Sequence, residues 1–197
     1  MPLSARLTIH SFTPPLRQPK IKHLAEEADV MKSQADDVRL FRGIFGMPSN
    51  HLISIGLWTE NGSAITLPDS ESVEAYTLTP TARPRSIPEL PEGGIVVFRW
   101  FDIDAENLDE FVALSDEAWA SLEASFDCRI MGLFKTEPQG NKIRMLLYTW
   151  YASHAEWERS RDARPEAGAS KAWENFMRRQ LLTDVTEAIV VAEIPLT

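Results

Sequence analysis

The chain has 197 residues, enough for one large or two small domains, and its 44% hydrophobic and 25% charged residues are typical of globular proteins. A formal net charge of -9 disfavours nucleic acid and membrane surfaces as partners. The single cysteine, Cys128, excludes an internal disulfide and is expected to be buried and inert. With no apolar run near the ~20 residues that span a bilayer and no signal core, we expect a cytoplasmic protein.

The first half predicts an antiparallel sheet with one helix. Strands are expected at Leu7–Phe12, Leu40–Met47, His51–Trp58 and Val73–Leu78. Apolar residues recur at helical spacing between the first two, at Ile21, Leu24, Ala25, Ala28 and Met31. Asn61-Gly62 favours a hairpin turn after the third strand and leaves no room for a second helix.

A break in the middle of the chain separates two halves. Four prolines and two glycines between Pro80 and Gly94 exclude a regular helix or central strand. We therefore expect a unit at 5–80, a proline-rich linker at 81–94 and a second domain at 95–197.

The second half predicts the order β-α-β-β-α-β. Strands are expected at Ile95–Phe101, Cys128–Lys135, Lys142–Trp150 and Glu187–Ile194. A long amphipathic helix starts at Asp104–Asn107, and another starts after Ser153, breaks near Pro165 and Gly168, and resumes through Met177. This order is the ferredoxin-like motif, a four-stranded antiparallel sheet with both helices on one face.

The two halves also resemble each other, since Gly43–Trp58 parallels Gly132–Trp150. The open face of such a sheet needs a cover, and a second sheet is the usual one. We therefore predict an α+β fold of two ferredoxin-like units of the dimeric α/β-barrel type. The first unit is a degenerate copy, and the antiparallel sheets pack face to face.

Val96–Val112 resembles the opening of a NIPSNAP domain, in which a strand close to ELRTY leads into a helix containing LDEF. Arg99 falls on the arginine of that motif and Phe101 on its tyrosine. Gly132–Glu137, Leu146–Arg161 and Lys171–Met177 resemble later NIPSNAP segments in the same order. The resemblance covers about 100 residues of the second half.

The NIPSNAP resemblance implies little about chemistry. Val97 replaces the motif glutamate, and Tyr148 or Thr149 replaces a histidine of the third strand. Known NIPSNAP proteins are mostly binding or scaffold proteins. Related dimeric α/β-barrel families include cofactor-free monooxygenases, isomerases, cyclases and haem enzymes, so fold likeness alone specifies no reaction.

His10 and Arg99 are the first candidate site residues. The repeat puts them at matching positions on their strands, on the same faces as Phe12 and Phe101. A charged or polar side chain in mid-strand is better placed toward a wet cavity than under helices, so we expect both on the open sheet face. The alternative is a salt bridge at a sheet rim.

The third strands supply further candidates. Trp58 and Trp150 occupy matching positions, Tyr148 and Arg144 share the face of Trp150, and His51 begins its strand near a turn. These groups can stack on and hydrogen-bond to a planar substrate, or be ordinary core and surface residues. We assign acid/base and anion-stabilising roles to His10, Arg99 and Tyr148. Substrate-binding roles go to Phe12, His51, Trp58, Phe101, Arg144 and Trp150.

The sequence contains no metal-ligand spacing and no phosphate loop, so no cofactor is expected. The leading hypothesis is an enzyme that binds an apolar or aromatic small molecule between the sheets, with proton-transfer, cyclisation, isomerisation or oxygenation chemistry. Alternatives are a non-catalytic ligand-binding or scaffold protein, and a haem enzyme using one of His10, His23, His51 and His154. A homodimer is compatible with the missing helix of the first half.

Overall fold

The computed structural model describes residues 3–12, 21, 23–24, 28–59, 65–162 and 171–196. The chain forms two compact units. Unit 1 comprises Met1–Pro80, Arg85–Ile87 and Ile189–Thr197, and unit 2 comprises Thr81–Pro84 and Pro88–Ala188. The end of the predicted second domain, from Ile189 on, therefore belongs to unit 1.

Unit 1 is an antiparallel sheet. Its strands are β1 (Ser4–Phe12), β2 (Asp37–Phe45), β3 (His51–Trp58) and β4 (Ser70–Pro80), joined by the last residues of β8 (Thr183–Ile194) in the order β4-β1-β3-β2-β8. His10 lies opposite Leu52, and Leu40 lies opposite both Ser54 and Ile194. The strand and helix pattern predicted for this half is confirmed where the structure describes it; Ala25 and Asn61-Gly62 lie outside the described residues.

One face of the unit 1 sheet is covered by the short helix α2 (Ala28–Lys32) and by Leu24. Phe12, Leu52 and Trp58 project from the strands into this core, where they meet Met31 and Leu67. Since side chains alternate between the faces of a strand, Thr8 and His10 share the α2-covered face with Phe12.

Unit 2 contains the complete ferredoxin-like order. It comprises β5 (Ile95–Asp104), a 3-10 turn at Ala105–Asn107, α3 (Leu108–Ser125), β6 (Cys128–Lys135), β7 (Lys142–Tyr151), α4 (His154–Asp162), α5 (Lys171–Leu181) and the first part of β8. The strand order is β8-β5-β7-β6, and the described pairings are antiparallel. The predicted α+β class and the β-α-β-β-α-β order are confirmed. The predicted helix break at Pro165 and Gly168 lies outside the described residues.

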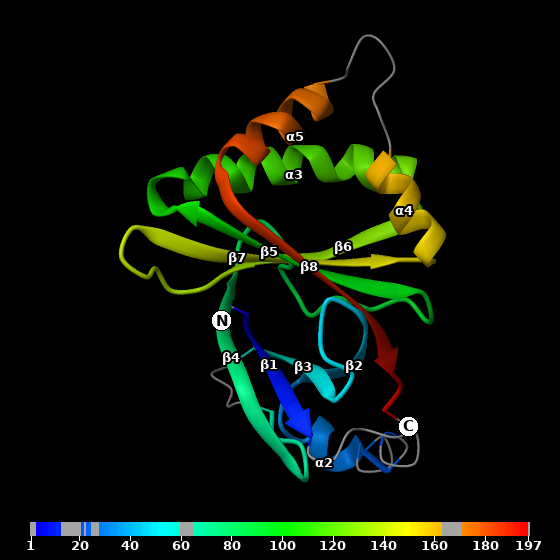
Figure 1. Cartoon of the computed structure of the whole chain (residues 1–197). Helices are drawn as coiled ribbons and strands as arrows, with labels where there is room; N and C mark the ends of the chain where they lie inside the picture. Colours follow the sequence, from blue (N-terminus) through cyan, green and yellow to red (C-terminus); the bar gives the residue numbers. More distant parts are fainter. Residues whose placement is uncertain are drawn as a thin grey trace. The chain divides into compact units, whose positions relative to one another are not determined.

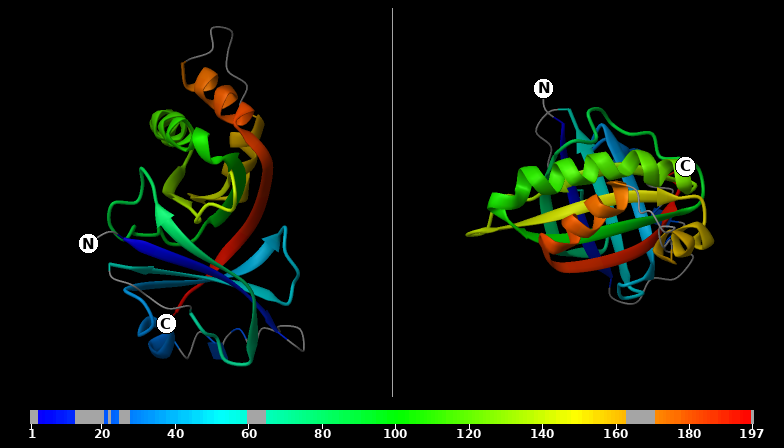
Figure 2. Two further views of the ribbon diagram at one scale, coloured as in Figure 1. Left: turned by 90° about the vertical axis from the view of Figure 1, so that its left-hand side faces the viewer. Right: turned by 90° about the horizontal axis from the view of Figure 1, so that it is seen from above.

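Helices α3 and α5 lie side by side over one face of the unit 2 sheet (Figure 1; Figure 2, right). Phe111 and Trp119 of α3 pack there on Phe101, Ile103 and other apolar strand residues. The predicted linker is partly docked on this sheet, because the Thr81 N–H donates to the Leu133 carbonyl at 2.9 Å. None of the described helices is long and apolar enough to cross a membrane.

Candidate functional site

Arg99 lies on the helix-covered face of the unit 2 sheet. It is opposite Leu147 across the β5–β7 ladder, and Leu147 packs in the core that α3 closes. Phe101, two residues on, packs edge-on against Phe111 of α3 with ring centroids 5.4 Å apart. The prediction that Arg99 faces away from the helices is therefore wrong. The prediction assumed that only water could stabilise an arginine in mid-strand. Beneath the helices, polar and aromatic side chains take that role.

Arg179 of α5 is the second arginine on this face, and its side chain is buried with 8% exposed. The guanidinium carbon lies 5.4 Å from the centroid of the Phe101 ring, 5.8 Å from that of Phe111 and 5.6 Å from that of Phe176. Its Nη1 donates to Ser115 Oγ of α3 at 3.4 Å. Three aromatic rings and one hydroxyl thus hold the cation in place, and none of these groups neutralises its charge.

The electrostatics join Arg99, Arg179 and Tyr151 in one cluster. Burial, and then the charge of Arg99, lower the pKa of Arg179 to about 10. Burial also lowers the pKa of Arg99, and the neighbouring Arg161 charge lowers it further. Burial raises the pKa of Tyr151, whereas its hydrogen bond with Ser160 and the Arg99 charge oppose that rise. Burial therefore disfavours the charged form of each of these three groups.

Helix α3 shapes the site because its inward residues are spaced one turn apart. Ser115 lies one turn after Phe111 and one turn before Trp119, and its hydroxyl donates to the Phe111 carbonyl at 2.7 Å. The buried Trp119 Nε1 has no hydrogen-bond partner among the described residues. On α5, Asn175 Nδ2 donates to Glu117 Oε2 at 2.7 Å, which ties the two helices together. The two helices therefore hold Arg179 in place. The indole N–H of Trp119, on the inward face of α3, has no acceptor among the described residues.

The predicted histidine lies in the other unit. His10 is buried on the α2-covered face, so the prediction that it faces away from the helices is also wrong. Its Nε2 lies 2.7 Å from Ser54 Oγ and its Nδ1 lies 3.4 Å from Ser70 Oγ. Ser70 uses its hydrogen on the Leu67 carbonyl, so it accepts from Nδ1, and the Ser54 hydroxyl donates to Nε2. Burial lowers the pKa of His10 to about 4, so the ring is neutral at pH 7.

The remaining unit 1 candidates are not gathered around His10 as a site. Phe12 and Trp58 are core residues on the α2-covered face, and Trp58 Nε1 donates to the Gln34 carbonyl at 2.9 Å. His51 alternates with Leu52, so it belongs to the opposite face of β3, at the start of the strand.

Tyr148, Arg144 and Trp150 lie on the face of β7 opposite to Arg99. Tyr148 is buried and packs against Phe98 with ring centroids 5.0 Å apart. Arg144 is paired with Glu187 at 2.8 Å, and Trp150 Nε1 donates to the Gly93 carbonyl at 2.8 Å. Trp58 is on a helix-covered face and Trp150 is not, so the predicted match between the two tryptophans is wrong. Arg99 and Tyr148, two of the predicted catalytic residues, therefore lie on opposite faces of the unit 2 sheet.

The donors suited to a metal or a haem are scattered. The described residues contain no cluster of three or more histidine, cysteine or acidic side chains that could hold a metal ion. All four histidines are described: His10 has both ring nitrogens engaged by hydroxyls, and His23 and His154 are exposed. His51 begins its strand and is partly exposed. These positions do not fit a buried histidine ligand to haem iron.

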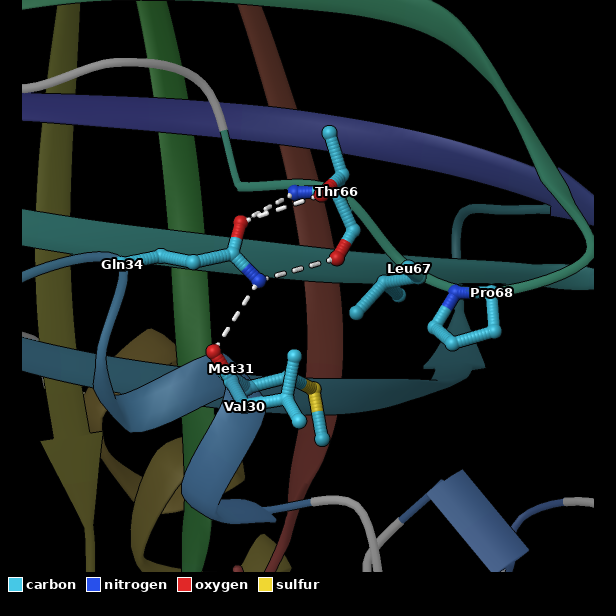
Figure 3. Close-up of a pocket in the computed structure, with 6 residues that line it drawn as sticks. All are labelled: Val30, Met31, Gln34, Thr66, Leu67 and Pro68. Atoms are coloured by element: carbon cyan, nitrogen blue, oxygen red, sulfur yellow. Dashed lines mark hydrogen bonds between the residues drawn. The ribbon is translucent and has the colours of Figure 1, made fainter.

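A surface pocket of about 290 Å³ lies beside α2 in unit 1 (Figure 3). Its wall includes Val30, Met31 and Leu67, and the Gln34 amide closes one side. That amide is already engaged, because its Oε1 accepts from the Thr66 N–H at 2.9 Å and its Nε2 donates to the Thr66 carbonyl at 3.3 Å. The pocket therefore offers an apolar surface and few free polar groups.

Sequence reasoning found Arg99 and Phe101 but missed Arg179, Tyr151 and Ser115. Arg179 follows Arg178 in a polar helix, where adjacent arginines predict a solvated surface. The available signal was its spacing from Phe176, three residues earlier, which puts a cation on the aromatic face of the helix.

Comparison with known proteins shows the fold. No protein-family model matches the chain, and no curated protein matches it. A candidate monooxygenase from Lactobacillus acidophilus NCFM superposes with a TM-score of 0.65 at 8% identity, covering 98% of this chain and 95% of its own. An anthrone oxidase-like protein gives 0.64 at 12% identity, with 98% and 92% covered. A chlorite dismutase variant from Candidatus Nitrospira defluvii gives 0.60 at 9%, with 98% and 92% covered.

Proposed function

We propose that the protein is an enzyme that binds an aromatic small molecule on the helix-covered face of unit 2 and oxidises it with dioxygen. The observation that carries the proposal is the placement of Arg179 beside the rings of Phe101, Phe111 and Phe176, with Arg99 on the same face of the sheet. Such a site combines an aromatic wall for a planar ring with fixed donors for an oxygen atom that becomes negatively charged.

The proposed reaction begins when a phenol, or a carbon next to a carbonyl group, loses a proton to solvent water, and this proton is recovered in the water that forms when dioxygen is reduced. Arg99 and Arg179 stabilise the resulting phenolate or enolate, and Tyr151 donates a hydrogen bond to it. The electron-rich anion then reduces dioxygen. For a methylene substrate, one methylene group and one molecule of dioxygen give one ketone and one molecule of water. Dioxygen therefore supplies both the oxidising power and the new oxygen atom.

One further observation supports this reaction class. Fold neighbours described as a candidate monooxygenase and as anthrone oxidase-like act as analogies for oxygenation of aromatic compounds. The NIPSNAP resemblance, whose motif residues Arg99 and Phe101 are the strand residues of the site, favours binding of a ligand here and specifies no reaction. A non-catalytic ligand-binding protein is the runner-up, and the same site would serve it.

The test is oxygen uptake by the purified chain in the presence of anthrones and naphthols, with ¹⁸O-labelled dioxygen as the oxidant. We expect one labelled oxygen atom in the product ketone, and a loss of uptake in Arg99→Met and Arg179→Met. Binding without turnover across the panel supports the ligand-binding alternative. Uptake that is unchanged in both variants would remove the catalytic site from this face.

A further inference from the structure

Unit 1 contains a second group of inward-facing polar side chains, on strand β1. Arg6, Thr8 and His10 are two residues apart, so they share the α2-covered face of the sheet. The Nε of Arg6 and the Oγ1 of Thr8 are both buried, and neither has a hydrogen-bond partner among the described residues. Thr8 as a whole is only 1% exposed. Two neighbouring polar side chains on one strand therefore lack the partners that buried polar groups normally have.

His10 shows that this face can satisfy a buried polar group with its own side chains. The hydroxyls of Ser54 and Ser70 engage both ring nitrogens of His10, at 2.7 and 3.4 Å. Ser54 also lies directly opposite Thr8 in the β1–β3 ladder. Its hydroxyl hydrogen is used on His10, and Thr8 makes no hydrogen bond to it. A buried hydroxyl left in this way is costly unless a bound molecule supplies the partner.

The β4 side of the two residues offers room and access. Strands β1 and β4 lie side by side (Figure 1), with Ala75 opposite Thr8 and Thr77 opposite Arg6. Both of these β4 residues are small and exposed. A small molecule therefore reaches the Arg6 and Thr8 side chains from this edge without displacing a large β4 side chain.

The β3 side is closed by an aromatic ring. Gly56 lies opposite Arg6, and a Cβ added at Gly56 would be 2.6 Å from the ring of Trp58. The indole therefore passes over Gly56, next to the Arg6 position. It is held there because its Nε1 donates to the Gln34 carbonyl at 2.9 Å. A ligand at Arg6 thus has a fixed apolar wall on the β3 side and an open β4 side.

The chemistry of the two groups selects the ligand. The guanidinium of Arg6 only donates hydrogen bonds, and the hydroxyl of Thr8 has a hydrogen to donate, so the partner must be an acceptor. Among the described residues of unit 1, the ion pairs are those of Arg39 with Asp37 and Glu193, and Arg6 makes none. The Cα atoms of residues two apart on a strand are roughly 6–7 Å apart, which one acceptor group can bridge. An anion between Arg6 and Thr8 satisfies both.

The charges on this face favour an anion with a single negative charge. The inward-facing titratable groups of the described unit 1 strands are Arg6, His10 and Arg42, and His10 is neutral at pH 7 because burial lowers its pKa to about 4. Arg42 is exposed, and it lies opposite Leu52, two strands across and four residues along from Arg6. That separation exceeds a Debye length of about 8 Å. Arg6 is therefore the one cation to be balanced beside Thr8.

We propose that unit 1 binds the carboxylate of a small organic acid between Arg6 and Thr8, at the edge of β1 that faces β4. The planar guanidinium matches the two oxygens of a carboxylate, and the Thr8 hydroxyl donates one more hydrogen bond to them. The site shares no residue with the site proposed in unit 2. It stands or falls independently of the reaction proposed there.

The experiment compares propionate, propionamide and inorganic phosphate on the full chain at pH 7.5 and constant ionic strength, by calorimetry and thermal shift. Propionamide has the shape of propionate without its charge. We expect propionate to bind saturably and at least roughly 10-fold more tightly than propionamide or phosphate, because a charge-assisted bidentate pair strengthens binding by that factor or more. Equal binding of propionate and propionamide would overturn the proposal. Phosphate binding as tight as that of propionate would overturn it too, and so would the absence of saturable binding up to roughly 10 mM.

Matched variants assign the binding to the site. Arg6→Met should weaken propionate binding roughly 10-fold or more, and Thr8→Val roughly 3- to 10-fold, whereas Thr8→Ser keeps the hydroxyl and should keep the affinity. Arg42→Met removes the exposed arginine of the same sheet face and should change nothing. Propionate affinity that survives Arg6→Met, or that is lost in Arg179→Met instead, would overturn the proposal.

The ligand-free melting temperature gives a separate check. Thr8→Val replaces the hydroxyl with a methyl group of similar size, so it should leave the melting temperature unchanged or raise it if the hydroxyl has no partner. A fall of several degrees would show that the folded chain already satisfies Thr8, for example with a buried water molecule, and would overturn the proposal. Each variant's ligand-induced shift is measured from its own ligand-free value.

Discussion

Replacing Arg179 with methionine should stabilise the ligand-free protein, although most buried substitutions destabilise. The arginine is buried and carries an unpaired charge, so its desolvation opposes folding at neutral pH. Methionine retains an unbranched apolar side chain for the space between the phenyl rings. The prediction follows from a site that sacrifices stability in order to bind a ligand.

The magnitude follows from the pKa of Arg179, which burial lowers to about 10 in the folded protein. A base with a lowered pKa in the folded state is penalised at every pH at which both states are charged, and the folded protein recovers stability only as the pH rises above about 10. At pH 7 the full penalty of about 3 kcal/mol applies. Loss of the aromatic and Ser115 contacts offsets roughly 1–2 kcal/mol, which leaves a net gain of about 1–2 kcal/mol.

Urea unfolding at pH 7 measures this gain, and the melting temperature should rise by roughly 2–8 °C for a chain of this size. Arg178→Met is the matched control, because it removes an exposed, paired arginine one residue away and should change stability by less than about 0.5 kcal/mol. If Arg179→Met instead lowers the free energy of unfolding by about 1 kcal/mol or more, the arginine is compensated in the folded protein and the reasoning fails.

Three further predictions concern other parts of the chain. Because the pKa of His10 falls from 6.5 to about 4 on folding, the unfolded chain binds the extra proton, and acidification from pH 6.5 to 4 should cost about 3 kcal/mol. Urea unfolding across that range checks it, and a His10→Gln variant that keeps the same slope would contradict it. Gly93 and Gly94 both have φ of +70°, but only at Gly94 would an added Cβ collide with the Tyr151 carbonyl. Gly94→Ala should therefore lower the free energy of unfolding by roughly 3 kcal/mol or more and Gly93→Ala by about 1, and equal losses would refute the assignment. Burial raises the pKa of Cys128 to about 12, so a thiol reagent at pH 8 should modify it only after denaturation, and rapid labelling of the native chain would be the opposite result.

The elements of the fold were largely predictable because their signals are local. The strand bounds Cys128–Lys135 and His51–Trp58 match the structure, since turn residues delimit both apolar runs. Ser153 caps α4 as expected, with the Glu156 N–H donating to its hydroxyl at 3.2 Å. The shared strand β8 was less predictable, because its division between the two units depends on contacts far apart in sequence.

The site was less predictable than the fold. The alternation of residues along a strand shows which side chains share a face, but it does not show which face the helices cover. Arg99 and Phe101 were correctly predicted to share one face of the sheet. That face was predicted to be the open one, because a charged group prefers water, whereas the helices cover it. The rings of Phe111 and Phe176 and the hydroxyl of Ser115, which accommodate Arg179 beneath the helices, come from two helices, α3 and α5, that are far apart in sequence. Contacts between residues so far apart in sequence form only in the folded chain, so no local sequence pattern predicts them.

The most direct test of the central claim is a crystal structure of the full chain with 1-naphthol. The account predicts the ligand on the helix-covered face of β5, with its hydroxyl oxygen within hydrogen-bond distance of the guanidinium of Arg99 or Arg179 and its ring against Phe101. A ligand found only in the apolar pocket beside α2, or an Arg179 that keeps only its contact with Ser115, would contradict it.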